Sequence, residues 1–194
     1  MDAQPAGRRR RRAVLSLSVL LAALALAATG CGGKSSDQKA LETYANTVCG
    51  HIATWKTQVK TIATDFSAGI SRASLQSKVK QIDSATKNLR EEIKAVPPPD
   101  TTKGHEARQQ LDQLSTELST TAAAVKAVVS GLKANASAAT IAESVIVLVP
   151  QVQSLATSAK TTLTTLQNDK GDISSAFKSA QSCKSLSSSS SGSS

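Results

Sequence analysis

Three cysteines and two histidines carry the most distinctive side-chain chemistry in this chain of 194 residues. Cys49 and His51 lie two positions apart, but a structural zinc site needs a second pair of ligands at a similar spacing. His105 has no such neighbour in the sequence. We therefore expect His51 at the rim of the fold and His105 in solvent, with neither bound to a metal.

The acidic and hydroxyl residues do not form a recognisable catalytic pattern. Glu91 and Glu92 are adjacent, so on a helix their side chains point about 100° apart and cannot act as a pair on one substrate. Asp112 and Glu117 also diverge at their spacing of five. The sequence contains no Gly-x-Ser-x-Gly motif, no glycine-rich phosphate loop and no Glu-x-x-His motif. We expect a protein that is not an enzyme, with no catalytic residue, no metal site and no cofactor.

The N-terminal thirty residues have the composition of a secretory signal. Five consecutive arginines, Arg8 to Arg12, precede an uncharged apolar run over residues 13–28. A basic segment, a short apolar segment and small residues before a cut site are the parts of such a signal. The apolar run is shorter than the roughly 20 residues of a membrane-spanning helix. We expect residues 1–30 to be removed from the mature protein.

The residues at the end of this segment resemble the lipobox of bacterial lipoproteins. Ala28, Thr29 and Gly30 occupy its small or aliphatic positions, and Cys31 follows them. The resemblance implies cleavage between Gly30 and Cys31, and attachment of a diacylglycerol to the Cys31 thiol. An ordinary signal peptide with an unmodified cysteine is the alternative.

Such an anchor implies a location on the extracytoplasmic face of the cell membrane. Each buried CH₂ group contributes about 0.8 kcal/mol, so two acyl chains hold a protein far longer than one. Residues 11–15 also resemble the twin-arginine export pattern. Either that route or general secretion would carry the chain across the membrane. The chain further resembles small exported lipoproteins of actinobacteria, of unknown function, in its high Ala, Ser and Thr content.

Charge and aromatic content argue against nucleic-acid binding. Removal of the signal takes away five arginines and one aspartate, which lowers the formal net charge from +9 to +5. No basic residues alternate with aromatic ones, as a surface for stacked bases requires. We expect instead an envelope protein or an anionic cell-wall component as a possible partner.

Two cysteines remain if Cys31 is lipidated. An exported chain permits oxidation, and a disulfide between Cys49 and Cys183 is the favoured prediction. The chain-entropy model assigns roughly 5 kcal/mol to a loop of this length. Two free buried thiols, or an intermolecular disulfide, are the alternatives.

The rest of the chain has the apolar spacing of helices. Apolar residues recur at alternating intervals of three and four over residues 41–66, 75–96, 107–132 and 141–166. We predict an all-α fold, an up-down antiparallel four-helix bundle over residues 37–184 with a short fifth C-terminal helix. Residues 31–36 would be the lipidated tether and residues 185–194 a disordered Ser-rich tail.

Individual residues predict where these helices begin and where they meet other segments. Ser36 or Asp37 is expected to cap the first helix, Asp100 or Thr101 the third, and Ser137 the fourth. Gly50, inside the first helix, is expected to mark a close approach of the backbone that carries Cys183. The apolar run over residues 145–149 is expected to be a buried segment.

Tyr44, Trp55 and Phe66 recur every 11 residues on one helix. They can belong to the core, or they can line a groove for a ligand. We therefore expect a membrane-anchored envelope lipoprotein whose bundle is a non-catalytic binding or structural module. The alternative is a carrier or sensor that holds a small apolar ligand between its helices.

Overall fold

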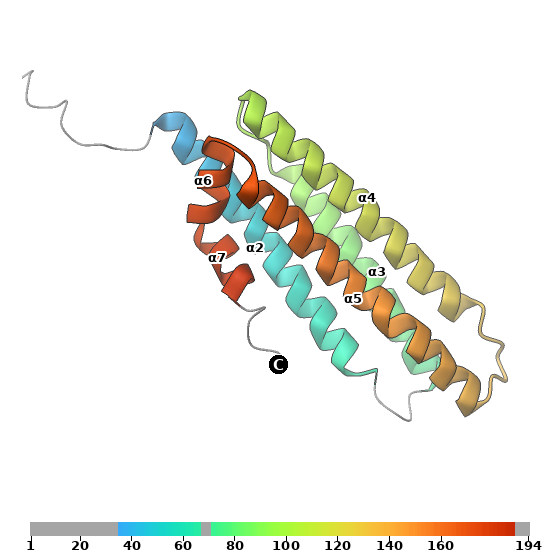
Figure 1. The fold of residues 1–194 in the computed structure, drawn as a ribbon. Coiled ribbons are helices and arrows are strands. Elements are labelled where there is room, and N and C mark those ends of the chain that lie inside the picture. Colours follow the sequence, from blue (N-terminus) through green and yellow to red (C-terminus); the bar gives the residue numbers. More distant parts are fainter. Residues whose placement is uncertain (1–34, 67–70, 189–194) are drawn as a thin grey trace, which may run out of the picture. The chain divides into compact units, whose positions relative to one another are not determined.

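The computed structural model describes residues 35–66 and 71–188, and every regular element among them is an α-helix (Figure 1). The all-α prediction is confirmed for these residues. Gly30, Cys31 and the predicted signal lie outside them. The helices are α2 (Ser36–Thr64), α3 (Arg72–Ala95), α4 (Thr102–Ser130), α5 (Ala138–Asn168), α6 (Asp172–Ser179) and α7 (Gln181–Ser188).

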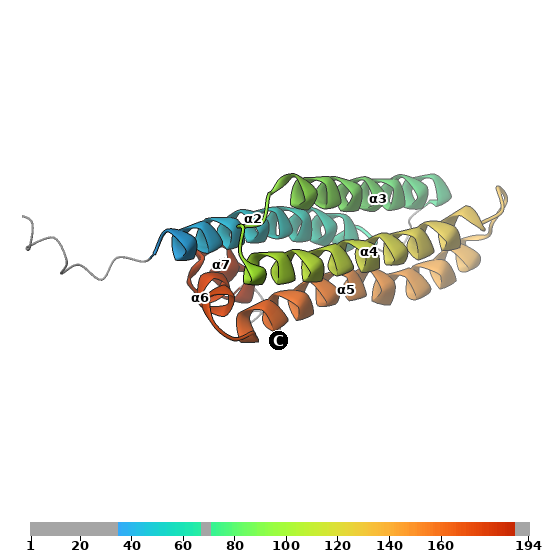
Figure 2. The same ribbon diagram turned by 90° about the horizontal axis from the view of Figure 1, so that it is seen from above.

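The four long helices share one hydrophobic core. Each buries the apolar stripe that its sequence predicted; on α2 the buried side chains are Leu41, Tyr44, Ala45, Val48, Cys49, Ile52, Trp55 and Val59. Helix α3 packs against both α2 and α4, and α5 packs against α4 (Figures 1 and 2). Contact between α2 and α5 is less extensive.

Side-chain caps begin each long helix. The residue just before the helix has an extended backbone, and its hydroxyl accepts a hydrogen bond from a backbone N–H three residues on, which contributes about 1 kcal/mol. The predicted caps Thr101 and Ser137 are confirmed. Helix α2 differs, because Ser35 caps it through a 3.2 Å bond from Gln38, and Ser36 is already helical.

The apolar run over residues 145–149 is not the buried segment that we expected. Leu148 is fully buried, but Ile146 and Val147 are 72% and 49% exposed. Five consecutive residues exceed one helical turn of 3.6, so they cannot all face the core. Helix α5, which continues through Pro150, is the one described helix that is long and apolar enough to cross a membrane.

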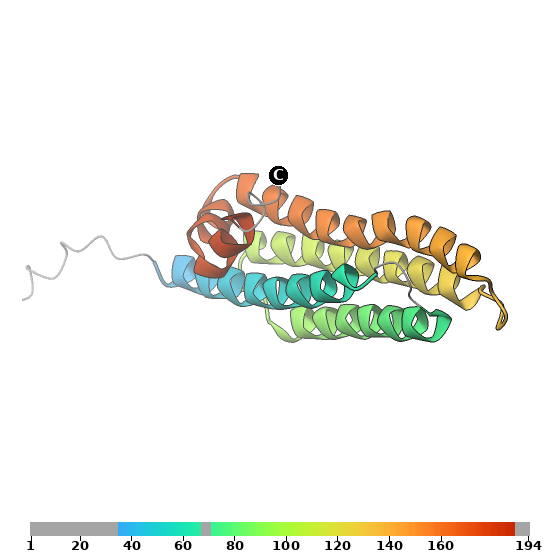
Figure 3. The same ribbon diagram turned by 90° about the horizontal axis from the view of Figure 1, so that it is seen from below.

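The C-terminal segment forms two short helices rather than one. Ala180 leaves the helical conformation with ψ 125° and separates α6 from α7. Both helices lie against α2, and α6 also contacts α5 (Figure 3). Helix α7 continues to Ser188, so residues 185–188 of the predicted tail are helical, and residues 189–194 lie outside the described part.

Candidate functional site

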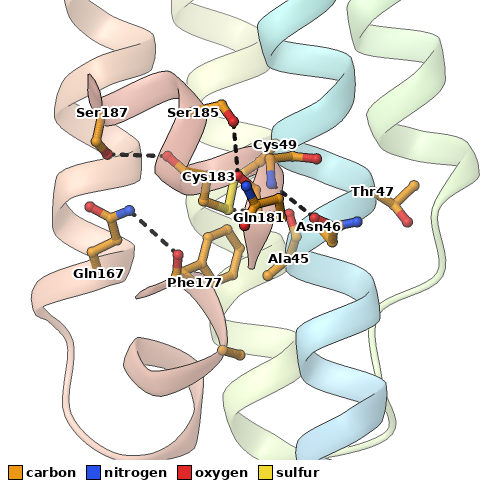
Figure 4. Close-up of a disulfide and its surroundings, with 12 residues drawn as sticks. Ala45, Asn46, Thr47, Cys49, Gln167, Phe177, Gln181, Cys183, Ser185 and Ser187 are labelled. Carbon is orange, nitrogen blue, oxygen red and sulfur yellow. Dashed lines mark hydrogen bonds between the residues drawn. A yellow bond between two sulfur atoms is a disulfide. The ribbon is translucent and has the colours of Figure 1, made fainter. Parts of the chain in front are cut away.

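A disulfide joins α2 to α7. Cys49 and Cys183 are bonded, with their Cα atoms 5.0 Å apart, and both residues are at most 1% exposed (Figure 4). The predicted pairing is thereby confirmed. Because both sulfurs are buried inside the core, the bond fastens the C-terminal segment to the first long helix.

Packing and hydrogen bonds hold the same segment in place. Ile173 and Phe177 of α6 are fully buried. The Ser182 backbone N–H donates to Asn46 Oδ1 at 3.0 Å, and Gln167 Nε2 donates to the Phe177 carbonyl at 3.4 Å (Figure 4). The segment thus contacts α2 on one side and α5 on the other.

Gly50 faces the segment that carries Cys183, as predicted, but the two backbones are not in close contact. A Cβ built on Gly50 would lie 3.8 Å from Ser182 Oγ, an ordinary van der Waals distance. The expected close backbone approach is therefore wrong. Gly104 is the glycine that has such an approach, since a Cβ there would collide with the Pro99 carbonyl oxygen.

The expectation that three aromatic residues lie on one helix is wrong for Phe66, because α2 ends at Thr64. The three aromatic side chains also do not meet in one pocket. Trp55 is buried, and its Nε1 donates to Thr86 Oγ1 on α3 at 3.3 Å. Tyr44 is also buried, and desolvation raises its pKa to about 12 against the opposing positive charge of Arg108. Phe66 alone of the three lines a surface groove, which is described below.

Both histidines lie beside carboxylates. His51 Nδ1 is 3.1 Å from Glu92 Oε2, with the histidine side chain 32% exposed, which agrees with the expected rim position. His105 Nε2 is 3.5 Å from Asp100 Oδ1 and is largely exposed. Residues 35–66 and 71–188 contain no group of three or more His, Cys, Asp or Glu side chains that could hold a metal ion.

Arg108 forms a polar clamp that the sequence analysis missed. Its Nη1 donates to the carbonyls of Ile93, Lys94 and Val96 at 3.1 to 3.4 Å, and its Nε donates to Asp112 at 3.1 Å. The last carbonyls of a helix lack intrahelical partners. The Arg108 guanidinium, on α4, therefore supplies hydrogen-bond donors to the carbonyls at the end of α3. The spacing of four between Arg108 and Asp112 was the one sign in the sequence that Arg108 is held in place.

A groove runs along the surface between α2 and α5. It consists of two adjoining hollows of about 220 and 330 Å³, and both are lined by Lys56 and Ala156. Ile52 and Leu163 line the first hollow, and Phe66 and Val149 line the second. Along the groove, the lower-numbered lining residues of α2 thus face the higher-numbered lining residues of α5.

Comparison of the chain with protein families, with curated proteins and with solved structures finds no match.

Proposed function

We propose that the protein is a lipoprotein anchored through Cys31 on the extracytoplasmic face of the cell membrane. Its helical domain acts there as a non-catalytic binding or structural module, with an envelope protein or an anionic cell-wall component as its partner. The proposal combines the lipobox resemblance of residues 28–31 with the fold of the helical domain.

The observation that carries this proposal is the Cys49–Cys183 disulfide. Disulfides form and persist in oxidising compartments outside the cytoplasm, and they are rare in cytosolic proteins. A chain that carries both an export-type N-terminus and a buried disulfide fits an extracytoplasmic location on two independent grounds. A short tether also fits, because α2 begins at Ser36, five positions after Cys31.

We also propose that α2 to α5 form an up-down antiparallel four-helix bundle. Consecutive helices contact each other, and short connections join α3 to α4 and α4 to α5, which favours antiparallel neighbours. The opposed numbering along the groove between α2 and α5 supports the same arrangement. The segment α6–α7 would then cover one end of the seam between α2 and α5.

The test is cell fractionation of Cys31→Ser, with Gly33→Ser as the matched control next to the cut site. Cells are fed labelled palmitate, and the protein is followed by size and by label. The control should be processed, labelled and membrane-bound. Cys31→Ser should lose the label and appear either as unprocessed precursor or as free protein. Processed, labelled Cys31→Ser protein in the membrane would contradict the proposal.

A further inference from the structure

We propose that the groove between α2 and α5 binds one long-chain fatty acid, with its acyl chain along the groove and its carboxylate at a lysine rim. The proposal rests on the binding-module function above and adds a small-molecule ligand to that module. We call the two hollows together the α2–α5 groove; the lining side chains that carry the argument are Val59, Phe66, Val152, Ala156, Lys60 and Lys160.

The shape of the groove fits an extended chain. Along α2 it reaches from Ile52 to Thr64, which is roughly 18 Å at 1.5 Å per residue, and Phe66 lines it just beyond the end of the helix. Small-molecule sites have volumes of about 300–1,000 Å³, and the two hollows together fall in the lower half of that range. A long, narrow space of this size accommodates one acyl chain rather than the paired chains of a phospholipid.

The floor of the groove is apolar. Val59, Phe66 and Val152 are at least nine-tenths buried and close it from below. Ala156 and Ala159 keep it hollow, because an alanine side chain ends at Cβ where larger residues would fill the space. Near the open end α5 also exposes Ile146 and Val147, a few residues before Val149. Burial of this apolar surface by an acyl chain is favourable.

The rim of the groove is positively charged. Lys56, Lys60 and Lys160 line it, and none of the described lining residues is an aspartate or glutamate. No salt bridge joins Lys60 or Lys160 to another residue of the described part. Lys60 and Lys160 are exposed, so each can attract a carboxylate by up to about 1 kcal/mol, and the two together favour the same end of a bound chain. The charge pattern therefore selects an anionic amphiphile over a neutral one.

The C-terminal segment closes one end of the groove. Leu186 and Ser187 of α7 line the first hollow, and the Cys49–Cys183 disulfide lies one turn away on the same helix. The disulfide thus fixes the wall against which the end of a bound chain would pack.

The test uses the full chain in bacterial cells fed a palmitic acid that carries a diazirine and a terminal alkyne. After irradiation, the protein is isolated through the alkyne and its labelled peptides are identified by mass spectrometry. Label without irradiation reports covalent acylation at Cys31 and so tests the anchor. Label that requires irradiation and lies on groove peptides reports non-covalent binding in the groove, so the two proposals fail independently.

We expect irradiation-dependent adducts with the mass of the free fatty acid on peptides that contain Phe66 and Val152. The charge variant Lys60→Glu/Lys160→Glu should reduce them about tenfold, and Ala156→Trp should reduce them by filling the groove. The matched control Lys80→Glu/Lys133→Glu makes the same change in net charge away from the groove and should retain the adducts. Retention of the Cys49–Cys183 disulfide and of the melting temperature checks that each variant is folded.

Several results would overturn the proposal. One is the absence of groove adducts in the folded protein. Another is equal labelling of the charge variant and its control. Adducts with the mass of a phospholipid would identify the bilayer as the source, and a cross-link to the Cys31 peptide would identify the chain's own anchor. Protection of the groove by a co-isolated protein would identify a protein partner, and each of these would reject a free fatty acid.

Discussion

Cys49 and Cys183 are covalently joined in the core although 134 positions separate them in the sequence. The bond links the middle of α2 to α7 and closes a loop that contains α3, α4, α5 and α6. Nearly the whole helical domain is therefore constrained by a single cross-link, and its stability should depend on the redox state of these two sulfurs.

Removal of the disulfide should lower stability substantially. In Cys49→Ser/Cys183→Ser the unfolded chain regains loop entropy, and the free energy of unfolding should fall by about 2–5 kcal/mol. Urea unfolding of purified protein measures this, and reduction of the wild-type protein provides a matched comparison. A midpoint unchanged by both treatments would show that the cross-link is not a stabilising element.

Gly50, inside α2, and Gly104, in the first turn of α4, should respond to alanine in opposite directions. Gly50→Ala should raise the free energy of unfolding by about 0.5–1 kcal/mol, since a Cβ fits there and glycine weakens a helix interior. Gly104→Ala should lower it by about 1–3 kcal/mol, because the Cβ would collide with the Pro99 carbonyl. Equal effects in urea unfolding would contradict the geometry of both sites.

Arg108 should stabilise the junction between α3 and α4. Arg108→Gln removes charge-assisted bonds to the end of α3 and to Asp112, and should cost about 2–3 kcal/mol. Arg90 is exposed on α3, so Arg90→Gln, the matched control, should change stability by less than about 0.5 kcal/mol. Thermal or urea unfolding of the two variants compares them directly, and similar losses would reject a specific role for Arg108.

Tyr44 should make the protein sensitive to high pH. Burial raises its pKa to about 12 in the folded protein, from an ordinary value near 10 in the unfolded chain. Between these values the unfolded state loses the proton first, so stability should be intact below pH of about 10 and fall by roughly 2–3 kcal/mol as pH approaches 12.

The chain has one tyrosine, so the near-ultraviolet absorbance of tyrosinate reports Tyr44 alone. Tyr44→Phe should reduce the alkaline loss of stability relative to wild type. A tyrosinate transition near pH of about 10 in the folded protein would show that the hydroxyl is accessible to solvent.

Much of the fold could be predicted from the sequence because the determining signals are local. Apolar residues such as Leu41, Ile82 and Leu111 recur at helical intervals, and each is buried where the periodicity places it. The caps Thr101 and Ser137 are likewise set by adjacent residues. The break at Ala180 was missed, because it arises where α6 and α7 turn to follow α2 and not from a proline or glycine.

The groove could be predicted only in part. Phe66 was singled out by its spacing, but its partners Val152 and Ala156 come from a helix more than 80 positions away. Trp55 belongs to the same apolar stripe, and yet its Nε1 donates to Thr86 on α3. Such pairings depend on how helices pack, which spacing along one helix does not specify.

The central claim is that the mature chain begins at a lipid-modified Cys31. The direct measurement is mass spectrometry of the N-terminal peptide of protein extracted from the membrane fraction of cells that make the full chain. We expect a peptide that starts at Cys31 and carries a diacylglycerol. An N-terminus at any other residue, or an unmodified Cys31, would contradict it.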